Sequence, residues 1–216
     1  MTGDGAIENS LRWGFTGAGG RHVMNELLEK VSITGWKRLL YGGIFLMLLW
    51  QLSRFWGQWE EGVTSIFYCI HGPMHEVGHT VAGMLHLPET AVILAGTVFQ
   101  VLTPVAAGIY LACKGDLSAI SFCTGWLGFS VMETGIYMYD AAIGQLTLVV
   151  PFMDASDCEG DFTLLFRQWG CLDSGCAIGR GFVYAGYSIV FISLAMIIAM
   201  FISGFLKKQV PPGEKS

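Results

Sequence analysis

This sequence contains unusually few charged residues. Only 13% of its 216 residues are charged, whereas 53% are hydrophobic and the mean hydropathy is +0.53. A soluble domain is about one quarter charged, so the chain has roughly half the charge that a water-facing surface needs. This composition excludes a disordered chain and favours a membrane protein.

Several common motifs are absent as well. Basic residues number 12 against 17 acidic ones, and no run of Lys and Arg is interleaved with aromatics, so nucleic acid is not an expected partner. The six cysteines form no CxxC pair and indicate no metal or redox motif. Met1–Lys30 lacks the apolar core of a secretory signal peptide. No internal repeat of the kind found in many transporters is visible.

Long apolar runs are abundant and predict an all-α, polytopic membrane bundle of five to six spans. A span needs about 20 apolar residues, and five such runs occur, at residues 39–55, 63–87, 91–113, 117–139 and 182–205. Ala141–Met153 has only 13 residues and is interpreted as a short sixth crossing or a re-entrant segment. The predicted regions are a polar or interfacial N-terminal segment, a membrane-embedded domain and a polar tail, at residues 1–38, 39–206 and 207–216.

Basic residues near both ends indicate the orientation in the lipid bilayer, the chain's first expected partner. Lys37 and Arg38 end the N-terminal segment, and Lys207 and Lys208 follow the last run. Such residues favour the cytoplasmic side, so both termini are predicted to be cytoplasmic. An even number of crossings then requires the sixth segment, and the expected location is a multi-pass position in the cell membrane.

The second run carries a metal-binding motif, His75-Glu76-Val-Gly-His79. On a helix, positions i and i+4 share a face, so both imidazoles can bind one Zn²⁺, while Glu76 takes a proton from the attacking water. The alternative is that these are histidines packed in a helical core. Burying three ionisable groups in a stretch otherwise suited to a bilayer is costly, which favours the metal site.

A catalytic zinc needs a third protein ligand, and the candidates are carboxylates. Glu133 and Asp140 lie near the end of the fourth run, where an acid is unusual enough to need a reason. The others follow the short apolar segment and are Asp154, Asp157, Glu159 and Asp161.

Two further polar residues are candidates for substrate binding. Pro73 predicts that the motif helix begins near Gly72, with His71 at its entrance; there His71 contacts a substrate, supports a metal ligand or simply packs. Gln100 lies in a run without charge and can hydrogen-bond a ligand, an extended substrate or a neighbouring helix.

Taken in order, the motifs resemble those of the site-2 protease family of intramembrane zinc metallopeptidases. The resemblance is nearest to a poorly characterised branch of small, multi-span bacterial proteins, whose metal motif is followed by G-x-x-x-Q-x-x-x-P, Y-x-x-D-A and H-D-W. The matching residues here are Gly96, Gln100 and Pro104; Tyr137, Asp140 and Ala141; and, for the last motif, Gly160-Asp161-Phe162. The resemblance covers about half the chain.

The sequence departs from this family at the third ligand. Site-2 proteases take it from an L-D-G motif, but the only Asp-Gly pair here is Asp4-Gly5, far upstream. Gly160 replaces the histidine of H-D-W. Asp161 keeps its match beside an aromatic residue and is therefore the favoured ligand, with Asp140 as the alternative.

The resemblance implies a zinc metalloendopeptidase that hydrolyses peptide bonds of membrane-protein or peptide substrates. A substrate helix would have to unwind to expose its carbonyl, and Gln100 would pair with that strand. One alternative is a catalytically degenerate member, a membrane scaffold that binds metal without turnover. Another is a metal or proton transporter, which would need polar residues in several spans; the first and last runs offer almost none.

Overall fold

The computed structural model describes residues 35–146 and 159–209, and these residues form helices, turns and loops without any strand. The predicted all-α fold is therefore confirmed for this part of the chain. The helices are α2 (Trp36–Phe55), α3 (Tyr68–Met84), α4 (Glu89–Cys113), α5 (Ala119–Asp140), α6 (Asp161–Gln168) and α7 (Gly175–Gln209), with single 3₁₀ turns η1 (Trp59–Glu61) and η3 (Leu172–Ser174).

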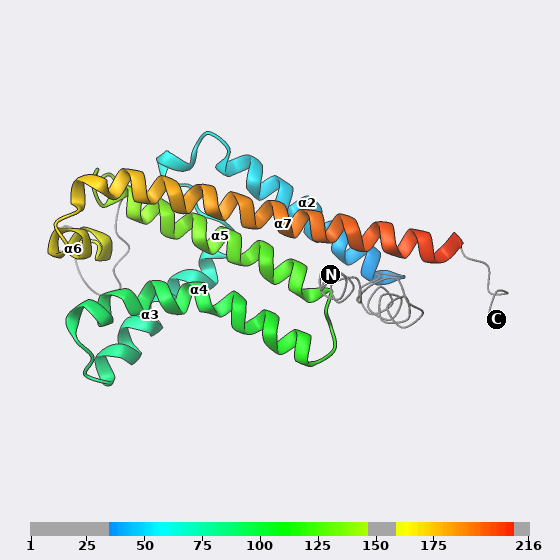
Figure 1. Cartoon of the computed structure of the whole chain (residues 1–216), viewed down its shortest axis with the longest axis horizontal. Helices are drawn as coiled ribbons and strands as arrows, with labels where there is room; N and C mark the ends of the chain where they lie inside the picture. Colours follow the sequence, from blue (N-terminus) through cyan, green and yellow to red (C-terminus); the bar gives the residue numbers. More distant parts are fainter. Residues whose placement is uncertain (1–34, 147–158, 210–216) are drawn as a thin grey trace, which may run out of the picture.

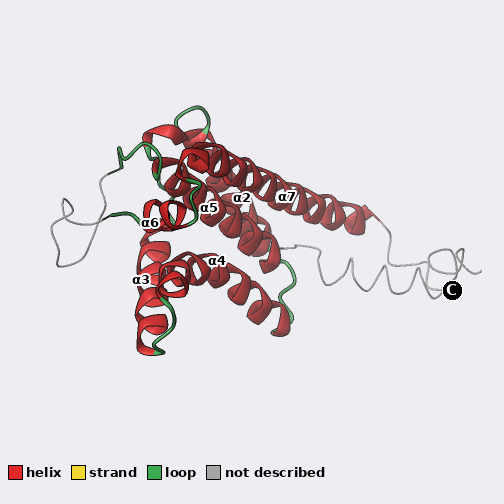
Figure 2. Cartoon of the chain, turned by 60° about the vertical axis from the view of Figure 1, so that its left-hand side comes forward, coloured by secondary structure: helices red, strands yellow, loops and turns green. Residues whose placement is uncertain are grey.

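The five long helices lie in the spatial order α2, α7, α5, α4 and α3 (Figure 1). Helices α5 and α7 form the antiparallel centre of the bundle, with α2 against α7 and the α3–α4 hairpin on the other side of α5 (Figures 1 and 2). The short α6 lies where α5 ends and α7 begins, next to the hairpin. Chain segments far apart in the sequence therefore meet at this end of the molecule.

Glycines allow α5 and α7 to pack backbone against backbone. Gly128 and Gly135 on α5 face Gly186 and Gly179 on α7, and both pairs are seven residues apart, about two helical turns. A Cβ added at Gly179 would lie 2.4 Å from the backbone nitrogen of Tyr139 and 2.5 Å from the carbonyl oxygen of Gly135. Small residues bring membrane helices close enough for van der Waals contact along their backbones.

Replacing Gly179 by alanine is expected to destabilise the bundle by about 1–3 kcal/mol, because the two backbones must separate to admit the methyl group. The matched control is Gly181→Ala on the same helix, where a Cβ would have no neighbour within 4 Å. Thermal unfolding of the purified proteins in detergent measures the difference. Equal melting temperatures for the two variants would contradict this account of the α5–α7 contact.

Two of the predicted membrane spans meet the requirements of length and hydropathy. Helix α4 and the continuous stretch Leu172–Phe205, which contains η3 and most of α7, are long and apolar enough to cross a membrane. The other three predicted runs also form helices, namely α2, α3 and α5. The structure therefore supports association with a membrane at this coarser level.

Other parts of the predicted topology stay predictions. Residues 141–146, the first part of the sixth apolar segment, form a turn after α5, while residues 147–153 lie outside the described residues. Most of the N-terminal segment (1–34) and the end of the tail (210–216) lie outside them too. Helix α2 begins at Trp36, slightly before the predicted start of the membrane domain.

Candidate metal centre and substrate cavity

The helix that carries the His-Glu-x-x-His motif begins earlier than its proline suggested. Tyr68 N–H donates to the Ser65 carbonyl at 3.1 Å, and His71 N–H donates to the Phe67 carbonyl at 2.9 Å. These bonds form the first turn of α3 from Tyr68, so the prediction of a start near Gly72 is wrong. Pro73 lies within the helix, and His71 is not at its entrance.

Three residues with metal-binding side chains meet beside α3. His75 and His79 share one face of the helix, and Asp161 is the first residue of α6. The Nε2 atoms of His75 and His79 lie 2.8 and 3.2 Å from Asp161 Oδ2, and the three ligand atoms are all within 4.8 Å of one another. Tetrahedral zinc with bonds of about 2.0–2.1 Å holds its ligand atoms roughly 3.3 Å apart. This donor set fits zinc.

Hydrogen bonds that involve the backbone fix the orientation of His79 and of Asp161. His79 Nδ1 donates to the Val92 carbonyl at 2.9 Å, and since a carbonyl only accepts, Nε2 is the nitrogen left to face Asp161. Metal-binding histidines in proteins are commonly oriented in this way. Asp161 N–H donates to the Tyr137 hydroxyl oxygen at 2.9 Å, which ties the start of α6 to α5.

Two glycines make room for the cluster at the crossing of α3 and α4. A Cβ on Gly96 would lie 2.5 Å from His79 Nε2 and 2.7 Å from His75 Nε2. A Cβ on Gly78 would lie 2.2 Å from the carbonyl oxygen of Ala95. Gly78 therefore permits the close approach of the helices, and Gly96 leaves open the space next to the two ligand nitrogens.

Asp161 is ionised near neutral pH. Burial alone would raise its pKa, but the neighbouring His75 and His79 side chains outweigh that effect and lower the pKa to about 2. A negative charge next to two imidazole nitrogens favours a cation at this position.

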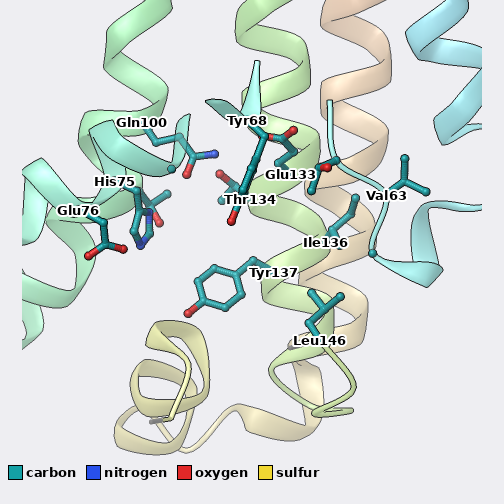
Figure 3. A pocket seen from close by; sticks show the side chains of 14 residues that line it. Val63, Tyr68, His75, Glu76, Gln100, Glu133, Thr134, Ile136, Tyr137 and Leu146 are labelled. Atoms are coloured by element: carbon teal, nitrogen blue, oxygen red, sulfur yellow. The ribbon is translucent and has the colours of Figure 1, made fainter. Parts of the chain in front are cut away.

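A cavity of about 310 Å³ lies directly beside the cluster (Figure 3). His75 and Glu76 lie in its wall, and Glu76 is exposed to solvent. Helices α3, α4 and α5 and the turns next to them supply the remaining residues, which include Val63, Tyr68, Gln100, Glu133, Thr134, Ile136, Tyr137 and Leu146. The cavity therefore gives access to His75 and to the Glu76 side chain.

Gln100, expected to contact a substrate, lies in the wall of this cavity. Its amide nitrogen donates to the Ser130 carbonyl at 3.4 Å, and this bond joins α4 to α5. The amide of Gln100 therefore faces the cavity while it holds two of the cavity's helices together.

His71 does not lie where a substrate contact requires it. Its side chain is 1% exposed, with Nδ1 2.5 Å from Glu133 Oε2 and Nε2 accepting a hydrogen bond of 2.7 Å from Trp126 Nε1. Both ring nitrogens are occupied, and the ring lies nearly parallel to that of Trp126, with the ring centroids 6.2 Å apart. Of the three roles considered for His71, these contacts correspond to packing inside the protein.

Asp140 is not brought to the histidines. Its Oδ1 accepts hydrogen bonds from the backbone nitrogens of Gln145 and Leu146 at 2.8 and 3.0 Å, so it stabilises the turn after α5. Among the other acids considered, Glu159 pairs with Arg167 at 2.7 Å. Asp154 and Asp157 lie outside the described residues.

Tyr137 and Gly96 contribute more to the site than their sequence context suggested. Each was a matched position in a weak motif, without an assigned role. The sequence does indicate that Gly96 lies on the same helical face as Gln100 and Pro104, because the three residues follow one another at intervals of four. These three residues are buried on one face of α4.

Comparisons with protein-family models, with curated proteins and with solved structures found no match for this chain. The functional argument therefore depends on the site itself.

Proposed function

We propose that this protein is an integral-membrane zinc metallopeptidase. The observation that carries the proposal is the grouping of His75, His79 and Asp161 around one point, beside a cavity whose wall contains Glu76. Asp161 follows His75 by 86 residues in the chain. A hydrogen-bonded orientation of His79 and the space at Gly96 add to this argument.

Each residue of the site has a separate role in the proposed hydrolysis. His75, His79 and Asp161 would hold zinc, which supplies a Lewis acid that polarises a carbonyl and activates water. Glu76 is next to a ligand but outside the ligand set, so its carboxylate is free to take a proton from the attacking water. It then gives the proton to the leaving amine. The wall of the cavity positions the peptide.

The outer surface of the bundle supports a place in the membrane. Six large apolar side chains of the two candidate spans are 46–61% exposed, namely Val98, Leu102, Ile109, Phe191, Ile192 and Ile202. Large apolar surfaces that are exposed on a folded chain mark contact with lipid or with another protein. Lipid is the natural contact for these faces, and membrane-associated proteins or peptides are the proposed substrates.

Metal content tests the proposal directly. We expect about one zinc per chain in the detergent-purified protein, since catalytic zinc sites use three protein ligands. His79→Ala and Asp161→Ala are expected to lose it. Asp140→Ala is the matched control, because that carboxylate binds the turn after α5 and should leave the zinc in place. Elemental mass spectrometry measures all four proteins.

Each other outcome has a definite meaning. No zinc in the wild type after supplementation would withdraw the metallopeptidase proposal. Loss of zinc from Asp140→Ala and not from Asp161→Ala would show that Asp140 is the third ligand in place of Asp161. Zinc without hydrolysis of any peptide would favour the alternative of a metal-binding membrane scaffold.

A further inference from the structure

A buried carboxylate lies in the cavity wall and has no role in the proposed chemistry. Glu133 on α5 is 8% exposed and lies in the wall of the cavity. Its Oε1 accepts a hydrogen bond of 2.6 Å from the backbone nitrogen of Ser65, and its Oε2 lies 2.5 Å from His71 Nδ1. Both carboxylate oxygens therefore already face hydrogen-bond donors of the protein.

The state of His71 follows from its other neighbour. Trp126 Nε1 donates to His71 Nε2, and an indole nitrogen is a donor only. Nε2 must therefore be unprotonated, which places the proton on Nδ1 and makes the imidazole neutral. His71 Nδ1 therefore donates a hydrogen bond to Glu133 Oε2.

Among the ion pairs of residues 35–146 and 159–209, the only partner of Glu133 is His71, and none joins Glu133 to a lysine or arginine. A buried charge without an opposite charge is unfavourable. The cavity is the side from which a cation can reach this carboxylate.

The neighbouring polar groups present acceptors as well. Thr134 Oγ1 donates to the Ser130 carbonyl at 3.0 Å, and Gln100 Nε2 donates to the same carbonyl. The Thr134 oxygen and the Gln100 Oε1 are left as acceptors, and the second N–H of the Gln100 amide is left as a donor. In Figure 3 the side chains of Gln100, Glu133 and Thr134 lie around one part of the cavity. This part carries one negative charge and accepts hydrogen bonds.

We propose that this part of the cavity binds the side chain of a lysine or arginine in the substrate, close to the bond that is cleaved. An ammonium or guanidinium group is a cation that only donates hydrogen bonds, so it matches the charge and the acceptors together. The inference rests on the proposed peptidase function. It goes further by naming the substrate class: peptides with a basic residue beside the scissile bond.

A pair of small zinc-binding probes tests the inference without a known substrate. Lysine hydroxamate and norleucine hydroxamate share the zinc-binding group, and their side chains differ in the terminal ammonium. We expect the zinc-containing wild type to bind the lysine probe at least about tenfold more tightly, the effect of one charged hydrogen bond. Titration calorimetry in detergent gives both affinities.

Glu133→Gln is expected to reduce this ratio to near one while leaving the affinity for the norleucine probe unchanged. The control is Glu89→Gln, which removes an equal charge from an exposed position in the first turn of α4 and should keep the ratio. If the Glu133 variant does not fold, the ratio in the wild type alone decides.

The outcomes separate this inference from the proposed function. Equal, zinc-dependent binding of the two probes to the wild type overturns the basic-residue preference and leaves the metallopeptidase proposal standing. Failure of both probes to bind the zinc-supplemented wild type contradicts the metal site, and the inference falls with it.

Discussion

Glu76→Gln is expected to keep one zinc per chain and to lower the rate of peptide hydrolysis by about 10²- to 10⁴-fold, the usual contribution of a general base. Glutamine has the same shape as glutamate but cannot take a proton from water. The zinc should stay because the proposed ligand set, His75, His79 and Asp161, does not include Glu76. Hydrolysis of fluorescently labelled casein, measured beside zinc content, separates the two effects.

Two variants bracket this result. His75→Ala is expected to lose both zinc and hydrolysis, because it removes a ligand. Glu89→Gln, on the exposed first turn of α4, should retain both. Hydrolysis at the wild-type rate by Glu76→Gln would defeat the proposed mechanism while leaving the metal site intact.

Gly96→Ala is expected to weaken zinc binding by about 10- to 100-fold, the range for changes that displace the supports of metal ligands. The added Cβ would lie 2.5 and 2.7 Å from the Nε2 atoms of His79 and His75, so one of these rings must rotate or α4 must move away. Competition with a zinc chelator of known affinity measures the change.

Gly83→Ala is the control for this experiment. Gly83 lies on α3 near the end of the helix, and a Cβ there would have no neighbour within 4 Å. Its zinc affinity should equal that of the wild type. An unchanged affinity in Gly96→Ala would show that the space beside the two histidines is not where the metal binds.

The local part of the candidate site could be predicted from the sequence. The spacing of His75 and His79 determines that they share a helical face once α3 forms, because i and i+4 neighbour each other on any α-helix. Asp161 was harder to select, since it comes from a separate helix. Periodicity gives no information on such distant pairs, and only the resemblance favoured it over Asp140.

Other features depended on packing that local patterns do not specify. A carboxylate after a helix can bind a metal or the next turn, and the sequence around Asp140 is compatible with both. The environment of His71 follows from Trp126 and Glu133, which α5 brings against α3. The unusual position of Glu133 in an apolar run was visible, but its partners were not.

The helices were predicted from local properties of the sequence, as was the pairing of His75 with His79. Long apolar runs identify α4 and α7 from composition alone, because length and hydropathy are local properties. The contact of α5 with α7 was visible only as glycines repeated at intervals of seven, at Gly128 and Gly135 and at Gly179 and Gly186. Which glycines face each other depends on the fold.

The distance along the chain between the histidines and Asp161 also sets an order of events during synthesis. The ribosome makes α3, α4 and α5 before it reaches α6, so a nascent chain holds the two histidines long before it has their carboxylate partner. Tyr137, which binds the backbone of Asp161, is likewise in place first. The group of His75, His79 and Asp161 is therefore complete only after translation has passed Asp161 and α6 has docked against α4 and α5.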